Sequence, residues 1–159
     1  MTREERMNYA AELFCGGYNC SQAVFAAFCD LTGYEKSEAL RLASSFGGGF
    51  ARHREVCGAV SGAVMVLGAL YGYDEPSKEK SAEHYARVSD YLNDFKELNQ
   101  SIVCRDLLKL SADKINTDSH TPTPTERSAE FYRSRPCARM VMCAVDLLLK
   151  HIEKIEESR

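Results

Sequence analysis

Cysteines are the residues of this sequence with the clearest capacity for chemistry. Their odd number argues against a framework of fixed disulfides. No two of them have the C-x-x-C spacing of a zinc ribbon or a thioredoxin-type motif, so any cluster must be assembled from separate parts of the chain. They can be reactive thiols, metal ligands or buried core residues. The seven are Cys15, Cys20, Cys29, Cys57, Cys104, Cys137 and Cys143.

Three of the cysteines fall in the first turn of predicted helices. Cys20 directly follows Asn19, which is predicted to cap a helix, and Cys137 directly follows Pro136. Cys57 follows a glycine-rich break in the chain. Free backbone N–H groups and the positive end of the helix dipole stabilise a thiolate at such positions and lower its pKa.

The other four cysteines have a simpler interpretation. Cysteine is among the most buried residue types, and a lone one usually fills a small space in the core. This interpretation is favoured for Cys15, Cys29 and Cys143. Cys104 is predicted to lie in a helix interior and, by position alone, also looks like a core residue.

Arginines adjoin several of these thiols in the sequence. Arg54 is close to Cys57, and Arg135 is close to Cys137. A neighbouring guanidinium favours the thiolate form of a cysteine.

A run of small residues, EVCGAVSGAVM, surrounds Cys57. Gly58 and Gly62 are separated by one helical turn, and Ala59 and Ala63 stand beside them. Such a smooth helix face lets another helix approach closely. The pattern therefore predicts that this face brings Cys57 near sulfurs of neighbouring helices.

Apolar spacing along the chain is typical of helices throughout, and no segment shows the alternation of a strand. The predicted fold class is all-α: a compact single-domain helical bundle of about six to eight helices over residues 1–159. Ser111 to Thr125 reads as an internal loop because of its polar composition and two prolines. The expected helices are 3–15, 20–31, 37–44, 56–71, 76–99 with a bend or break near Asn99, a continuation through 102–108, 126–133, and one from 136 into the charged tail.

The composition indicates a water-soluble globular protein. The chain has 159 residues, of which 45% are apolar and 27% are charged, with a net charge of -3. Nucleic-acid binding is not expected, because it requires a clustered basic face. Membrane insertion is not expected either, because polar residues interrupt every long apolar run. Residues 1–7 are charged and do not resemble a secretory signal, so we expect a cytoplasmic location with reduced thiols.

At these cysteines the sequence resembles a family named for its cysteine pattern, C_GCAxxG_C_C, whose members are regarded as redox-active. The CGAxxG motif stands at 57–62, and the leading cysteine corresponds to Cys20 in GYNCSQAV. The two trailing cysteines fall most naturally on Cys104 and Cys137, with Cys143 as a rival for the last position. The resemblance covers nearly the whole chain.

The resemblance implies a redox role for Cys20, Cys57, Cys104 and Cys137, and it makes Cys104 a candidate site residue. It does not imply a particular reaction. One hypothesis is a thiol–disulfide redox protein, with an oxidoreductase activity. A thiolate, with Cys57 or Cys20 as first choice, attacks a redox partner protein or a small disulfide, and a neighbouring cysteine resolves the mixed disulfide.

Two other hypotheses stay open. In the second, the same four cysteines, Cys20, Cys57, Cys104 and Cys137, bind zinc or an iron–sulfur cluster, since four thiolates suit either centre. In the third, the chain is a non-catalytic helical interaction module with buried cysteines. The amphipathic first and last helices then support self-association into a homo-oligomer.

Overall fold

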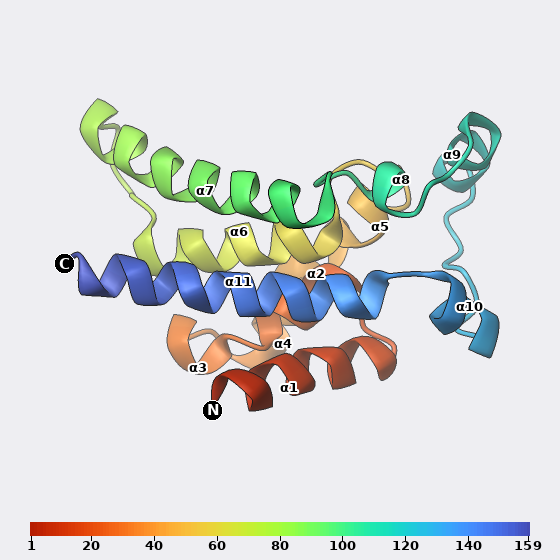
Figure 1. Cartoon of the computed structure of the whole chain (residues 1–159), viewed down its shortest axis with the longest axis horizontal. Helices are drawn as coiled ribbons and strands as arrows, with labels where there is room; N and C mark the ends of the chain where they lie inside the picture. Colours follow the sequence, from red (N-terminus) through yellow and green to blue (C-terminus); the bar gives the residue numbers. More distant parts are fainter.

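Helices account for 72% of the residues in the computed structural model, which describes residues 1–159 (Figure 1). The all-α class predicted from the sequence is therefore confirmed. The elements are α1 (Arg3–Cys15), α2 (Cys20–Ala26), α3 (Cys29–Thr32), α4 (Lys36–Ala43), the 3-10 turn η1 (Ser44–Phe46), α5 (Gly47–Phe50), α6 (Gly58–Tyr71), α7 (Lys78–Asn99), α8 (Cys104–Leu107), α9 (Ala112–Ser119), α10 (Ala129–Ser134) and α11 (Cys137–Glu157).

The number of helices exceeds the six to eight predicted from the sequence. The excess comes mainly from α3, α5 and α8, which have four residues each. Within α5, both Gly48 and Gly49 have φ of 67°, so this segment is a turn rather than a regular helix. Sequence periodicity detects long amphipathic helices, whereas single turns leave no periodic pattern.

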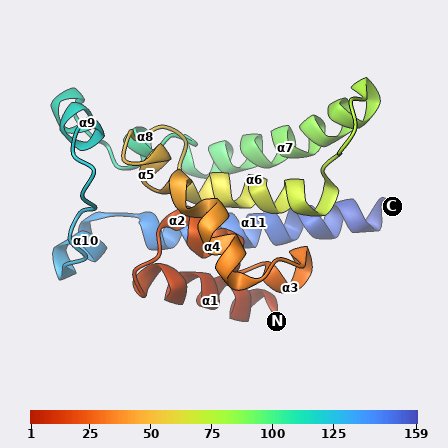
Figure 2. The same ribbon diagram turned by 180° about the vertical axis from the view of Figure 1, so that it is seen from behind.

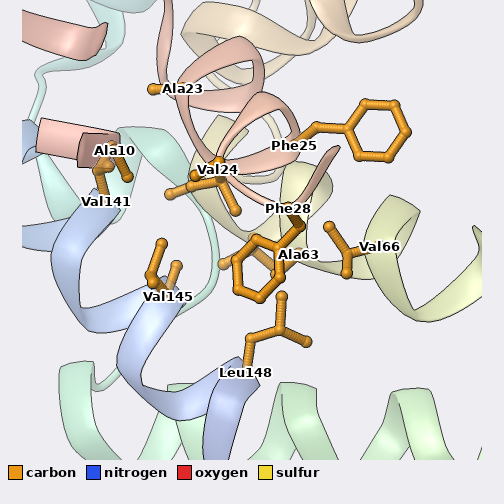
Figure 3. Close-up of a cluster of buried hydrophobic side chains, with 14 of the residues drawn as sticks. Ala10, Ala23, Val24, Phe25, Phe28, Ala63, Val66, Val141, Val145 and Leu148 are labelled. Atoms are coloured by element: carbon orange, nitrogen blue, oxygen red, sulfur yellow. The ribbon is translucent and has the colours of Figure 1, made fainter. Parts of the chain in front are cut away.

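Four long helices form the body of the molecule. In Figure 1, α11 runs between α1 on one side and α6 and α7 on the other, and Figure 2 shows α2 and α4 on the opposite face. The core lies where α2, α6 and α11 meet, with Val24, Ala63, Val66, Val145 and Leu148 all fully buried (Figure 3). No helix combines the length and the apolar surface that crossing a membrane requires.

The smooth face predicted around Cys57 packs against α2. A Cβ atom added to Gly62 would lie 2.8 Å from the carbonyl oxygen of Ser21 and 3.0 Å from Cβ of Val24. A Cβ added to Gly58 would lie 3.2 Å from Cβ of Cys20. Glycine at these two positions therefore lets α6 approach α2 closely, which brings Cys57 towards Cys20.

The prediction of an internal loop over 111–125 is wrong, because α9 occupies most of that segment. The Ser111 hydroxyl caps this helix by accepting a hydrogen bond from the Lys114 N–H. The helix is anchored by Asp118, whose buried carboxylate pairs with Arg54, far away in the sequence. Such a long-range ion pair has no signature in local composition. Within the predicted loop, only Ser111 and the residues from His120 onwards lie outside this helix.

The predicted helix over 20–31 is divided into α2 and α3 at Ala27 and Phe28. The buried guanidinium of Arg6 donates a 2.6 Å hydrogen bond to the Ala27 carbonyl and pairs with Asp30. This tertiary contact satisfies a carbonyl that is free at the break. The predicted break near Asn99 is confirmed, since α7 ends there and Gln100 has a φ of 70°.

The packing of α6 predicts a large difference between two Gly→Ala substitutions in that helix. Gly62→Ala should lower the free energy of unfolding by about 1–3 kcal/mol, because the new methyl group meets the backbone of α2. Gly68→Ala, where the methyl meets open space, should raise it by about 0.5–1 kcal/mol. Urea unfolding followed by circular dichroism measures both, and equal effects would show that close α2–α6 packing is unimportant.

Candidate functional site

All four cysteines of the predicted site line one cavity of about 280 Å³. They are Cys20, Cys57, Cys104 and Cys137. Cys57 and Cys104 are 6% and 8% exposed, and the other two are half-buried. All are free thiols. Cys143 does not line the cavity; its sulfur accepts a 3.5 Å hydrogen bond from Asn99.

Each of these four cysteines stands at the beginning of a helix. Cys20 and Cys137 are the first residues of α2 and α11, as predicted, and Cys57 precedes the first residue of α6. The prediction that Cys104 lies in a helix interior is wrong, because α8 begins at Cys104 itself. The reason is that the left-handed backbone at Gln100 ends α7, and the chain starts a new helical turn after it.

Cys20 is held in place by a capping box. The Asn19 side chain accepts a hydrogen bond from the Gln22 N–H at 2.9 Å, and the Gln22 side chain accepts one from the Asn19 N–H at 3.1 Å. The Asn19 amide also donates to the Ser44 carbonyl. Gly47 packs on this amide so closely that an added Cβ would overlap it. The cap and the glycine-rich turn therefore fix the first turn of α2 against the cavity.

Cys57 and Cys104 are held together by backbone pairing. The Cys57 N–H donates to the Ile102 carbonyl at 2.8 Å, and the Cys104 N–H donates to the Glu55 carbonyl at 2.6 Å. These two bonds flank the single antiparallel bridge of the structure, between Val56 and Val103. This pairing of two segments that are distant in the sequence places Cys57 and Cys104 in the lining of the same cavity.

A buried arginine lies beside these thiols. Arg54 is 3% exposed, its Nε donates to the Asp118 carboxylate at 3.0 Å, and its Nη1 lies 3.8 Å from the Cys104 sulfur. Arg54 is close to Cys57 in sequence, yet its guanidinium contacts Cys104. Burial opposes ionisation of Asp118, but hydrogen bonds from Lys114 and Arg54 outweigh it and leave the pKa of this carboxyl below its usual value.

Sequence analysis missed three charged residues of the site, Arg52, Asp118 and Arg127. The Arg127 guanidinium donates to the carbonyls of Phe14 and Tyr18 at 2.7 and 3.0 Å, and it stacks over the ring of Phe131. All three residues make their contacts at the site with residues more than 60 positions away in the sequence. No local pattern could have identified them.

Cys137 is the thiol of the cavity that ionises most readily. A hydrogen bond with the Cys20 thiol lowers the pKa of Cys137 to about 7, against the opposing effect of burial. The positive charges of Arg135, Arg54 and Arg127 act in the same direction. Among the cavity thiols, Cys137 is therefore the one that forms a thiolate most readily near neutral pH.

The other three thiols are held protonated. The hydrogen bond to Cys137, together with burial, raises the pKa of Cys20 well above its ordinary value. Burial raises the pKa of Cys57 to about 12, although hydrogen bonds from backbone N–H groups of α6 act against it. Burial also raises the pKa of Cys104, against the attraction of Arg54. The predicted stabilisation of a thiolate by a helix N-terminus is therefore outweighed by burial at Cys57, and the lowered pKa of Cys137 comes from Cys20 and the arginines.

The four sulfurs share a cavity without forming a metal-ligand set. No group of three or more cysteine, histidine, aspartate and glutamate side chains is arranged to hold a metal ion. The arrangement instead supplies one thiol with a lowered pKa, a second thiol that interacts with it, and two more deeply buried thiols in the same cavity.

The pKa difference predicts that Cys137 is alkylated first. Its rate of reaction with iodoacetamide should rise with pH through a midpoint near 7 and level off above it, because only the thiolate reacts. Cys20→Ala removes the hydrogen bond and should move this midpoint up by about one pH unit or more. Cys29→Ala, outside the cavity, should leave it unchanged. Peptide mass spectrometry measures each site, and an unchanged midpoint in Cys20→Ala would contradict the assignment.

Comparison with known proteins adds one match. The family model described as "Putative redox-active protein (C_GCAxxG_C_C)" matches residues 18–151, a span that contains all four cavity cysteines. No curated protein and no solved structure matches the chain. Since the match extends over most of the 159 residues, the chain belongs to the C_GCAxxG_C_C family of redox-active proteins.

Proposed function

We propose that this protein carries out thiol–disulfide exchange, with Cys137 as the nucleophile and Cys20 as the resolving thiol. Membership of a family named as redox-active supports a redox role at a general level. The observation that carries the more specific proposal is that Cys20 and Cys137 line the same cavity, each as the first residue of its helix, and that their interaction lowers the pKa of Cys137. Two thiols therefore share one cavity, and the pKa of one of them lies near neutral pH.

The exchange begins when the Cys137 thiolate attacks one sulfur of a substrate disulfide. A bond forms between Cys137 and that sulfur, the substrate S–S bond breaks, and the second substrate half leaves as a thiolate. This thiolate takes the proton of the Cys20 thiol. The Cys20 sulfur then attacks the Cys137 sulfur, and the first substrate half leaves as a thiolate that takes a proton from solvent.

The net result is the oxidation of Cys20 and Cys137 to a disulfide and the reduction of one substrate disulfide to two thiols. The reverse exchange with a dithiol reductant returns two electrons and restores both protein thiols. Atoms and electrons therefore balance without a bound cofactor.

Cys57 and Cys104, the more deeply buried thiols, do not act as the nucleophile in this proposal. Burial keeps Cys57 and Cys104 protonated at neutral pH, so they are poor nucleophiles compared with Cys137. Arg54 contacts the Cys104 sulfur and also favours the Cys137 thiolate. We assign Arg54 as a positioning residue that keeps positive charge beside the reacting sulfur.

The zinc or iron–sulfur hypothesis makes a different demand on the same residues. It requires the sulfurs of Cys20, Cys57, Cys104 and Cys137 to converge on one centre, whereas no three such donors are arranged in that way. Exchange needs only two thiols that share the cavity, which Cys20 and Cys137 do, and we therefore favour it.

The exchange proposal predicts that removal of the resolving thiol traps a mixed disulfide. Cys20→Ser treated with hydroxyethyl disulfide should accumulate one adduct, on Cys137. The wild type should pass through this adduct at least about tenfold faster, because a neighbouring thiol has a high effective concentration. Intact-mass and peptide mass spectrometry after acid quenching distinguish the adduct from the Cys20–Cys137 disulfide.

Cys29→Ser is the matched control, because Cys29 is also half-buried but does not line the cavity. Its time course should equal that of the wild type. Adducts that form only on the exposed Cys15, or an equally short-lived adduct in Cys20→Ser, would contradict the proposed roles.

Metal content separates the two chemical hypotheses. We expect iron, zinc and acid-labile sulfide to stay well below one equivalent per chain in protein purified without oxygen, since exchange needs free thiols. Elemental analysis and a sulfide assay measure them. Near-stoichiometric metal that falls on replacing Cys57 or Cys104 by serine would instead establish the four-cysteine metal site.

A further inference from the structure

The cavity around the thiols carries an excess of positive charge. Four arginines line it, Arg52, Arg54, Arg127 and Arg135, and no aspartate or glutamate does. A lining of this kind attracts anions and raises their local concentration. The protein as a whole has a net charge of -3, so the positive cavity is a local feature and not a consequence of composition.

Two of these arginines are compensated by a carboxylate outside the cavity lining. Arg52 and Arg54 both pair with Asp118, at 3.2 and 3.0 Å, and Lys114 shares the same carboxylate. One negative charge thus faces three positive ones. The Nη2 atom of Arg54 is buried and has no hydrogen-bond partner.

The other two arginines have no carboxylate partner at all. Arg127 donates only to the neutral carbonyls of Phe14 and Tyr18, and the Arg135 guanidinium makes one long bond of 3.4 Å to the Thr125 hydroxyl. Burial and the charge of Arg54 lower the pKa of Arg135, which is the effect expected of a cation without a full counter-charge.

Both free arginines line the same cavity as the reacting sulfur. The guanidinium carbons of Arg127 and Arg135 lie 4.9 and 4.7 Å from the centre of the Phe131 ring, which itself lines the cavity. The charges of both arginines favour the Cys137 thiolate. A ligand group held by these two side chains would therefore share the cavity with Cys137.

The rest of the cavity suits a small molecule with an apolar part. Its volume of about 280 Å³ is close to the lower limit of about 300 Å³ for ligand pockets. Apolar side chains make up much of the remaining lining, including Phe14, Leu107, Leu108 and Met140. Cavities that combine apolar walls with a few fixed charges orient small ligands.

We infer that the substrate is a small disulfide that carries carboxylate groups, and that Arg127 and Arg135 bind a carboxylate while Cys137 attacks the adjacent sulfur. This inference rests on the proposed exchange reaction and specifies its substrate class. The step is the exchange described above, so the products are two carboxylated thiols and the Cys20–Cys137 disulfide.

Three small disulfides that differ mainly in charge test the inference. They are dithiodipropionate, which is anionic, hydroxyethyl disulfide, which is neutral, and cystamine, which is cationic. Rate constants for oxidation of the wild-type protein are divided by those of the same disulfides with a neutral small thiol, which removes differences in intrinsic reactivity. We expect a preference of about tenfold or more for the anionic disulfide over the neutral one, and the slowest reaction with cystamine.

Variants assign this preference to the two arginines. Arg127→Gln with Arg135→Gln should reduce the anionic-to-neutral ratio about tenfold, whereas the same positions changed to lysine should keep most of it. The ratio of the two rates is compared because both arginines also favour the Cys137 thiolate. A change in that effect alters the rates with the anionic and the neutral disulfide equally and leaves their ratio unchanged. Arg133→Gln is the matched control, since Arg133 belongs to the same segment but is exposed and paired with Glu130.

A second measurement tests anion binding without any disulfide. Glutarate, a dicarboxylate that contains no sulfur, should slow alkylation of Cys137 in the wild type and in the lysine variant but not in the glutamine variant. Equal normalised rates for all three disulfides together with no protection by glutarate would overturn the inference and leave the exchange reaction intact. Protection by glutarate without reaction of any disulfide would overturn the exchange proposal and keep the anion site.

Discussion

The close approach of α2 and α6 is the constraint on which the site depends. Gly58 and Gly62 carry no side chain where the two helices touch, and even one methyl group at Gly62 would meet the backbone of α2. This contact sets the separation of the helix ends that carry Cys20 and Cys57. Once these two ends are fixed, α8 and α11 add Cys104 and Cys137 to the same cavity. Cys57, which has no other cysteine near it in the sequence, thus lies in one cavity with three other cysteines because of helix packing.

Burial and helix-end electrostatics compete at each thiol, and the structure shows which one prevails. At Cys57 the N–H groups of α6 favour the thiolate, yet desolvation prevails and the pKa rises. At Cys137 a neighbouring thiol donor and three arginines reverse the balance. All four cysteines lie at the beginning of a helix, yet the pKa shifts of their thiols differ, because each sulfur has different neighbours.

Much of this organisation could be predicted from the sequence. The small residues after Cys57 predicted the close helix packing, and the resemblance to the C_GCAxxG_C_C family pointed to the four cysteines that line the cavity. The Asn19 and Gln22 capping box was also recognisable, because both residues of the motif are local.

The choice of Cys57 or Cys20 as the first nucleophile was not supported by the pKa directions, which favour Cys137. That difference depends on a contact between residues 20 and 137 and on burial, and neither is encoded in local spacing. The same applies to α9, which reads as a loop until the pairing of Asp118 with Arg54 is known. Long-range pairing of buried charges is what the sequence could not reveal.

The connection between α9 and α10 supplies part of the cavity lining, and the contacts that hold it do not depend on pH. Arg52 binds the Thr121 carbonyl and the Thr125 hydroxyl, and Arg127 ties the following residues to α1 and to the turn after it. Guanidinium groups stay charged and these acceptors stay neutral at any physiological pH, so acidification does not release this cover. The cavity walls contributed by Pro122, Pro124 and Thr125 of this connection therefore stay in place across this range of pH.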